Sequence, residues 1–272
     1  MKNLRLFAAI WVMWLAVPVQ AGLVPESELW EYWLPHNEQS TAVVDHEPWQ
    51  MILDRYLQPS DPGANLFDYQ SVTTADRQRL QSYLDGLAAT DPRALNRPEQ
   101  FAYWANMYNA LTVAVVLDYY PVKSIRRIEG GLLGLGPWNE EFISVQGQAL
   151  TLNDIEHRIL RPIFQDPRIH YAVNCASIGC PDLMPDAFVA AKLNEQLDAA
   201  ARGFINDARG VTFRKQRLQL SSIYDWYAGD FGAGEAGLIE HLSAYAEPDL
   251  QERLQNHTGR LRYDYDWRLN QP

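Results

Sequence analysis

Residues 98–117 read PEQFAYWANMYNALTVAVVL, and this stretch decides the class of the fold. Pro98 and Glu99 suit the first turn of a helix, where a proline loses no hydrogen bond and a carboxylate meets the positive end of the helix dipole. Apolar residues then occur on every side of the helix, which is typical of a helix buried in the middle of a domain. We therefore predict a buried central helix over residues 99–117.

Two amides interrupt this apolar helix. Asn106 and Asn109 are three residues apart, so they share one face of the helix. A buried amide without a partner costs roughly 1–3 kcal/mol, so each of them needs a hydrogen bond. They either line a functional site or bond to the backbone of a neighbouring loop, and the sequence leaves both alternatives open.

The segments on either side of the central helix show helical and strand patterns in turn. The expected elements are amphipathic helices at residues 74–87 and 187–205, a helix starting at residue 153, hairpins across 142–152 and 211–220, a buried strand at 168–174 and a last strand at 260–265. The fold class that these elements predict is α+β. We expect a helix-rich single domain with a central buried helix packed on a small sheet.

Composition limits the classes of partner. The chain has 272 residues, of which 47 % are apolar, and its formal net charge is -11 at pH 7. This is the composition of a folded protein, and its acidity argues against nucleic acid or anionic lipid as the main partner because both would be repelled. The glycine-rich segment 130–137 has no Lys-Ser/Thr after it, so we expect a surface loop or lid and not a phosphate-binding loop.

The first residues have the layout of a secretory signal. Lys2 and Arg5 precede an uncharged apolar run over residues 6–19, and Ala21 offers a small residue at the cleavage site. This run is shorter than the roughly 20 residues that span a bilayer, so an uncleaved anchor is the less favoured alternative. We expect a signal peptide at 1–21, one domain at 22–272, and a periplasmic or secreted protein with no stable membrane insertion after cleavage.

A polar cluster lies at residues 154–161. Glu156 and His157 are adjacent and point about 100° apart on a helix, whereas Arg161 lies on the same face as His157. One interpretation is a semi-buried polar network. The other is a solvated face on which Glu156 caps the start of the helix.

Both cysteines of the chain lie in one short segment, Cys175 and Cys180. On the expected strand His170 and Cys175 face opposite ways, so a thiol–imidazole pair needs either Cys180 or a histidine from elsewhere, such as His157. Four interpretations stay open: a Cys175–Cys180 disulfide, a thiol nucleophile paired with a histidine, a redox dithiol, and a zinc site.

A second aromatic segment lies at residues 221–231. Trp226 and Asp230 are spaced as neighbours on one helical face. They either line a pocket or belong to a helix that docks on the core with a terminal carboxylate, and aromatic stripes more often belong to the core.

Several long motifs resemble the domain of unknown function family numbered 547. The matching motifs are residues 101–111 (FAYWANMYNAL), 120–125 (YPVKSI), 152–161 (LNDIEHRILR), 166–181 (DPRIHYAVNCASIGCP) and 226–231 (WYAGDF). They occur in the family's order and cover roughly residues 65–232. The segment 263–270 (YDYDWRLN) is similar to the end of exported bacterial members.

This resemblance implies a likeness to papain-like and transglutaminase-like cysteine hydrolases. It implies a thiol-dependent hydrolase or acyltransferase acting on peptide or isopeptide bonds of a peptide or cell-envelope substrate. Cys175 or Cys180 is then the expected nucleophile, and His157 or His170 the expected base.

The remaining roles fall to polar residues near these four. Glu156 or Asn109 is expected to orient the imidazole, and Asn106 or a nearby backbone N–H is expected to stabilise the oxyanion. We expect no cofactor, no metal and no nucleic-acid partner. The alternative function is a non-catalytic binding module of the cell envelope in which Cys175 and Cys180 form a disulfide bond.

Overall fold

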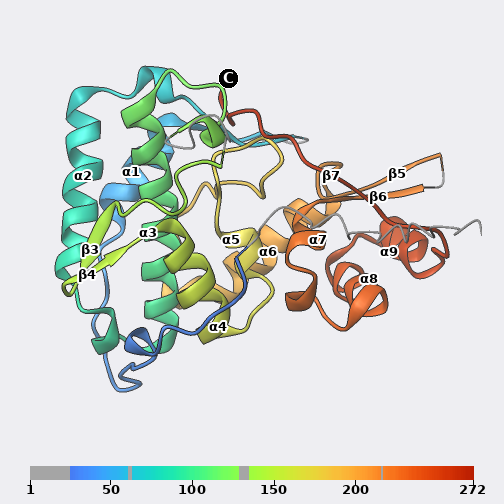
Figure 1. The fold of residues 1–272 in the computed structure, drawn as a ribbon, viewed down its shortest axis with the longest axis horizontal. Coiled ribbons are helices and arrows are strands. Elements are labelled where there is room, and N and C mark those ends of the chain that lie inside the picture. The colour runs from blue at the N-terminus through green and yellow to red at the C-terminus, as the bar shows by residue number, and fades with distance from the viewer. Residues whose placement is uncertain (1–24, 61–62, 129–134, 216) are drawn as a thin grey trace, which may run out of the picture.

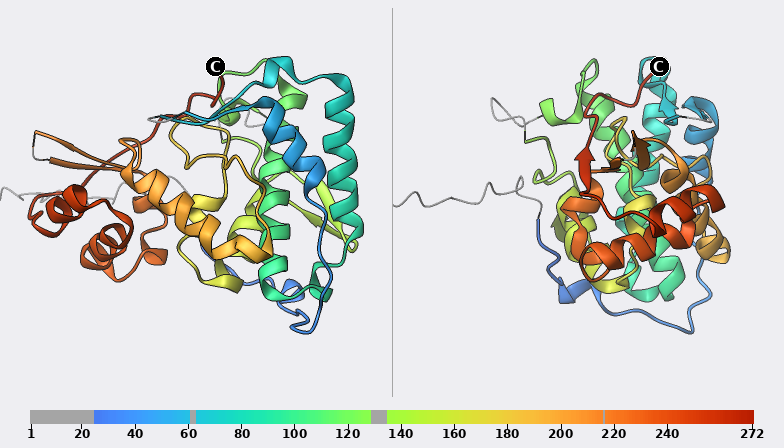
Figure 2. Two further views of the ribbon diagram at one scale, coloured as in Figure 1. Left: turned by 180° about the vertical axis from the view of Figure 1, so that it is seen from behind. Right: turned by 90° about the vertical axis from the view of Figure 1, so that its right-hand side faces the viewer.

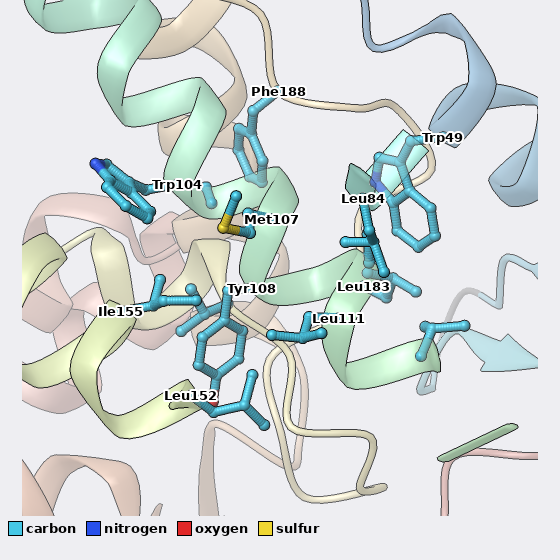
Figure 3. Packing of buried hydrophobic residues seen from close by; sticks show 14 of the residues in the cluster. Trp49, Leu84, Trp104, Met107, Tyr108, Leu111, Leu152, Ile155, Leu183 and Phe188 are labelled. Atoms are coloured by element: carbon cyan, nitrogen blue, oxygen red, sulfur yellow. The ribbon is translucent and has the colours of Figure 1, made fainter. Parts of the chain in front are cut away.

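Helix α3 (Arg97–Tyr119) runs through the left-hand part of the structure in Figure 1 and is the buried helix of that part. The Asn96 side chain accepts a hydrogen bond from the Glu99 amide and so caps its first turn. Nearly all of the side chains of α3 are buried, including Trp104, Met107 and Tyr108, which pack against residues from several other segments in Figure 3. The predicted buried central helix is therefore confirmed.

The computed structural model describes residues 25–60, 63–128, 135–215 and 217–272. The expected signal peptide at 1–21 lies outside the described residues, and so does most of the glycine-rich segment 130–137. The fold is α+β and about 51 % helical. Among the described residues no helix combines the length and hydrophobicity needed to cross a bilayer, although α3 has 23 residues.

The other elements surround α3 or extend from it. The helices are α1 (Glu47–Tyr56), α2 (Thr74–Ala89), α4 (Arg161–Phe164), α5 (Ile169–Ala172), α6 (Leu193–Asn206), α7 (Ile223–Trp226), α8 (Gly234–Tyr245) and α9 (Pro248–Gln255). The 3-10 helices are η1 (Glu31–Trp33), η2 (Tyr69–Ser71), η3 (Pro92–Ala94), η4 (Ile125–Arg127), η7 (Ala190–Lys192) and η8 (Ala228–Asp230), and η6 (Asp154–Leu160) is a π-helix.

In the part of the chain that the structure describes, the strands form three small sheets. The strands are β1 (Leu57–Gln58), β2 (Leu66–Phe67), β3 (Ile143–Val145), β4 (Gln148–Leu150), β5 (Val211–Arg214), β6 (Arg217–Ser221) and β7 (Arg262–Asp264). Each of the pairs β1–β2, β3–β4 and β5–β6 is antiparallel, and β7 adds to β6 in parallel. The two predicted hairpins and the predicted last strand are therefore confirmed.

The core is divided into two clusters of buried side chains. The first surrounds α3 and takes in α1, α2, η6 and the β3–β4 hairpin. The second lies between the β5–β6 hairpin and helices α6, α7, α8 and α9. Helix α6 joins them, since Leu193 and Leu197 belong to the first cluster and Phe204 and Ile205 to the second. Figure 2 shows α6 running between the two parts of the molecule.

This division corrects the expected position of the central helix. Helix α3 packs mainly against α2, η3, η6 and η7, and the three-stranded sheet belongs to the other cluster. The central helix is thus surrounded by helices and is not packed on the largest sheet. An all-round apolar helix requires burial, but its pattern does not specify which elements bury it.

The predicted buried strand at 168–174 is wrong, because α5 occupies this position. The Asp166 side chain accepts from the Arg168 amide and its carbonyl accepts from the Ile169 amide, which starts a helical turn after Pro167. The Asn109 side chain then donates to the carbonyl of Ala172 at 2.9 Å, where the turn ends. The strand parity that separated the faces of His170 and Cys175 therefore does not apply.

The predicted helix at 187–205 begins later, at Leu193. The Asn106 amide explains the difference, since it donates to the carbonyl of Phe188 at 2.8 Å and accepts from the Phe188 amide at 3.0 Å. With both backbone groups bonded to α3, Phe188 stays outside the helix.

The last residues of the chain return to the first cluster after β7 (Figure 1). The Ile178 amide donates to the carbonyl of Arg268, and the Gly179 amide donates to the carbonyl of Asp266, both at 2.8 Å. A side chain at Gly179 would meet the Asp266 backbone at 2.6 Å, so this close approach requires glycine. The return places residues 265–270 beside the loop that carries both cysteines.

Candidate active site

The π-helix η6 presents Glu156 and His157 to the site. Thr151 and Asp154 bond reciprocally at its start: the Asp154 amide donates to the Thr151 hydroxyl, and the Thr151 amide donates to the Asp154 carboxylate. One interpretation expected Glu156 to cap the start of this helix. Thr151 and Asp154 form the cap instead. A π-turn inside a helix is frequent at functional sites, and here it leaves the Glu156 carboxylate available to the interior.

Glu156 lies beside two imidazoles. Its Oε1 atom is 3.9 Å from Nδ1 of His157 and 3.9 Å from Nδ1 of His170. Its side chain is only 7 % exposed, and its charge opposes, without cancelling, the hydrogen bonds that lower the pKa of the Cys175 thiol. The carboxylate is therefore close to both histidines and electrostatically linked to the thiol, which agrees with the predicted semi-buried polar network.

His157 is held in its neutral form. The Arg161 guanidinium donates to Nδ1 of His157 at 3.1 Å, and since a guanidinium only donates, this nitrogen must carry a lone pair. Burial lowers the pKa of His157 to about 4. The Arg161 bond occupies the nitrogen that a base would use, so His157 is poorly placed to accept a proton.

His170 is oriented by a carboxylate from another part of the chain. Its Nε2 atom is 2.7 Å from Oδ2 of Asp230, and Nε of Arg161 donates to the same oxygen at 2.6 Å. Burial opposes ionisation of Asp230, but the hydrogen bonds from His170 and Arg161 outweigh it and hold the pKa of this carboxyl well below its usual range. Nε2 donates its proton to the Asp230 carboxylate, which only accepts. Nδ1 of His170 is therefore the nitrogen that has a lone pair.

The Nδ1 atom of His170 is buried and forms no hydrogen bond with any described residue. The His170 ring stacks on Tyr227, with centroids 4.2 Å apart and planes 13° from parallel. The imidazole is thus fixed on its face by Tyr227 and at one nitrogen by Asp230, and only Nδ1 is uncommitted.

The aromatic segment favoured a helix that docks on the core and ends in the Asp230 carboxylate, but Asp230 has a different role in the structure. Helix α7 ends at Trp226, and Asp230 lies in the separate turn η8, so the two residues do not share one helix. Asp230 bonds to His170 and Arg161 and is not simply the terminal carboxylate of a docking helix. The carboxylate at the end of an aromatic motif was the sequence signal for this residue.

Cys175 is a half-buried thiol between two hydroxyls. Its Sγ atom is 3.1 Å from Oγ of Ser177 and 3.1 Å from Oη of Tyr265, and these two oxygens are 2.9 Å apart. Hydrogen bonds from the Cys180 thiol, Ser177 and Tyr265 outweigh burial and the Glu156 charge and lower the pKa of Cys175. Neither Ser177 nor Tyr265 was predicted as a site residue from the sequence. Ser177 lies in the cysteine motif, whereas Tyr265 reaches the site only because the last residues of the chain return to the cysteine loop.

Cys180 has a different environment. It is buried, and burial raises the pKa of its thiol well above the usual value. Its sulfur accepts a hydrogen bond from the Cys175 amide at 3.1 Å. Both cysteines are free thiols and are not at disulfide distance, so the expected Cys175–Cys180 disulfide is absent from the structure. Cys180 instead closes the turn after Cys175.

The backbone after Cys175 is held in an uncommon conformation. Ala176 has a φ of 57°, in the left-handed region that alanine adopts at a cost of roughly 1–2 kcal/mol. The Asn174 side chain accepts from the Ala176 amide at 2.8 Å and donates to the carbonyl of Pro181 at 2.7 Å. These bonds fix the turn that presents the Cys175 sulfur.

The side-chain amides of Asn106 and Asn109 on α3 form hydrogen bonds with the backbone of neighbouring segments. Asn109 donates to Ala172 and accepts from the Asn174 amide at 2.8 Å, so it holds the chain just before Cys175. Asn106 bonds to both backbone groups of Phe188. Of the two alternatives for these residues, the contacts match bonding to a neighbouring loop.

The site therefore has two parts joined by Glu156. Among the described residues no hydrogen bond links a histidine to either sulfur: Cys175 bonds to hydroxyls, and His170 bonds to Asp230. Glu156 neighbours the free nitrogen of His170 and acts electrostatically on Cys175. In the described part of the chain, no group of histidine, cysteine and carboxylate side chains is arranged to hold a metal ion.

Comparison with known proteins gives one match. Residues 92–205 match the model of a family described as "Protein of unknown function, DUF547". No curated protein and no solved structure matches the chain. The matched segment contains α3, η6, α5 and the cysteine loop, and it supports assignment of this part of the chain to the DUF547 family.

Proposed function

We propose that this protein is a thiol-dependent hydrolase or acyltransferase of peptide or isopeptide bonds, with Cys175 as its nucleophile. The observation that carries the proposal is the contrast between its two thiols. Cys175 is half-buried, lies 3.1 Å from two hydroxyls and has a lowered pKa, whereas Cys180 is buried and has a raised pKa. Since the thiolate is the nucleophilic form, only Cys175 is prepared to attack a carbonyl.

The base in this proposal is His170, positioned by Asp230. As Sγ of Cys175 bonds to the carbonyl carbon, the thiol proton passes through the Glu156 carboxylate to Nδ1 of His170, which lies 3.9 Å from Oε1. The imidazolium then protonates the leaving amine as the C–N bond breaks and a thioester forms. Water or a second amine next takes the acyl group and restores the thiol.

The oxyanion in this proposal is stabilised by hydroxyls. Because the attacked carbon bonds directly to Sγ, its oxygen forms within reach of donors that already surround the sulfur. Ser177 and Tyr265 are such donors, each 3.1 Å from Sγ. They take the role that the sequence assigned to Asn106, whose amide bonds to the Phe188 backbone instead.

The proposal includes the likeness to papain-like and transglutaminase-like cysteine hydrolases and the exported, cell-envelope setting that the sequence predicts. What supports the likeness is an imidazole that a carboxylate orients, close to a carboxylate that acts on a thiol of lowered pKa. Asp230 comes from a separate segment from His170 and Cys175, as triad members do in unrelated folds.

Transfer of an acetyl group from p-nitrophenyl acetate tests the function without knowledge of the natural substrate. We expect a burst of p-nitrophenol and acetylation of Cys175, mapped by mass spectrometry of peptides. Cys175→Ser should abolish the burst. Cys180→Ser is the control, because its hydroxyl can still accept from the Cys175 amide and donate to the Cys175 sulfur, and it should retain the burst. A burst that survives Cys175→Ser, or acetylation elsewhere, would contradict the proposal.

A further inference from the structure

The outer face of the sheet formed by β5, β6 and β7 is basic. The inner face packs on the second cluster through Val211, Leu218 and Leu220, which are buried. Alternate residues of a strand face opposite ways, so Arg214 and Arg217 point outward. Figure 1 shows β5 and β6 extending beyond α7, at the end of the molecule farthest from α2.

The strand register brings the outward-facing arginines together. Arg214 on β5 is directly opposite Arg217 on β6, and Arg262 on β7 is beside Gln219. Together with Lys215 these side chains line a hollow of about 470 Å³. We call this set the basic face; its residues are Arg214, Lys215, Arg217, Gln219 and Arg262.

The charges of the basic face are not neutralised by the protein. All four cations are exposed, and among the described residues none of them forms an ion pair. The carboxylate in the next outward position, Asp264, accepts from the Gln219 amide at 3.2 Å. Like charges directly opposite each other destabilise a sheet, yet the fold keeps Arg214 against Arg217 in a chain whose net charge is -11. An anion in the hollow would relieve this repulsion.

We propose that the basic face is a binding site for a phosphate-bearing anion. Guanidinium groups present a planar fork of donors that matches phosphate oxygens, and arginine is the residue typical of such recognition. Three guanidinium groups, one ammonium and the Gln219 amide surround one hollow, which suits a compact ligand with more than one negative charge. The phosphate belongs either to a soluble compound or to a lipid headgroup.

Calorimetric titration of the whole protein with sodium pyrophosphate tests the site. We expect binding that weakens as salt increases, since exposed charges are screened. Arg217→Gln and Arg262→Gln should each weaken binding about tenfold. Arg127→Gln removes the same charge from η4, also exposed, and should leave the affinity unchanged. Arg217→Gln should not lower the melting temperature, because it removes one of two opposed like charges.

Sedimentation with vesicles of phosphatidylglycerol and phosphatidylcholine distinguishes the two sources. Pyrophosphate binding without vesicle binding supports a soluble phosphate compound. Vesicle binding that pyrophosphate displaces, and that Arg217→Gln weakens, supports a headgroup. No pyrophosphate binding at low salt, or an equal loss in Arg127→Gln, would overturn the proposal. The acyl-transfer function does not depend on any of these outcomes.

Discussion

His170 donates a hydrogen bond from Nε2 to Oδ2 of Asp230 across 2.7 Å, although 60 residues separate them in the sequence. This bond connects α5 to the turn that follows α7. It also determines which imidazole nitrogen remains free, because the proton on Nε2 is committed to the carboxylate. Arg161 donates to the same oxygen and keeps Asp230 ionised.

Replacing Asp230 with asparagine should remove most of the acyl-transfer activity. An amide at this position can donate to Nε2 and so favours the tautomer with the proton on Nδ1, where a base needs a lone pair. We expect the burst rate with p-nitrophenyl acetate to fall by about a hundredfold or more, the usual range for loss of general acid–base catalysis. Asp225→Asn, on the exposed side of the neighbouring helix α7, is the matched control. Equal rates for the two variants would exclude a role for the His170–Asp230 pair.

Replacing Tyr265 with phenylalanine should make Cys175 less reactive. The variant removes a hydroxyl 3.1 Å from Sγ that helps to lower the pKa of the thiol, so the pKa should rise. The rate of iodoacetamide alkylation near neutral pH should therefore fall several-fold, and its pH midpoint should move upward. Tyr263→Phe removes a hydroxyl two positions away, on an exposed residue of β7, and should leave the midpoint unchanged. An unchanged midpoint in Tyr265→Phe would contradict the role of this hydrogen bond.

The two amides of α3 should be equally important for stability but not for thiol chemistry. Asn109→Ala and Asn106→Ala each leave a buried carbonyl and a buried amide without a partner, which should lower the free energy of unfolding by about 3 kcal/mol in urea denaturation. Only Asn109 holds the backbone next to Cys175, so only Asn109→Ala should change the alkylation rate of the folded protein. Similar changes in both variants would show that the effect is a general loss of structure.

Buried neutral histidines should make the protein less stable in mild acid. Burial lowers the pKa of His46, His157 and His241 from 6.5 to about 4 each. Between these values the unfolded chain binds more protons than the folded one, so stability is complete above about pH 6.5 and declines as pH falls toward 4. Each histidine should contribute a slope of about 1.4 kcal/mol per pH unit in urea unfolding.

A pair of histidine variants checks the origin of this slope. His46→Gln should make the slope shallower by about one histidine's share. His241→Gln should make it shallower by a similar share. A slope equal to that of the unchanged protein in both variants would mean that carboxylates and not buried histidines dominate the acid response.

Much of the local structure was predictable from nearby residues. The central helix is determined by apolar residues on all of its sides after Pro98, and the two hairpins by short alternating segments around turns such as Gln146-Gly147. The candidate residues of the polar cluster and of the cysteine segment were also identified, because buried polar groups and thiols are conspicuous in such surroundings. These features depend on interactions within a few residues, which a sequence pattern records directly.

Two predictions of secondary structure were wrong, and in both places a residue distant in the sequence determines the backbone conformation. Residues 168–174 resemble a strand, but Asp166 starts a helical turn there and Asn109 binds its last carbonyl. Helix α6 begins later than predicted because Asn106 binds the backbone of Phe188. In each case a hydrogen bond from the central helix overrides the local preference.

Patterns within the chain predict the helical centre, the hairpins and the set of polar residues near the two thiols. The roles of these residues depend on tertiary contacts: Asp230 meets His170 from the turn after α7, and Tyr265 meets Cys175 through the return of the chain end. The difference lies in how far apart in the chain the interacting residues are. Periodicity reports which residues must be buried, whereas the hydrogen bonds that select one thiol and one imidazole nitrogen join segments that meet only after the two clusters have packed.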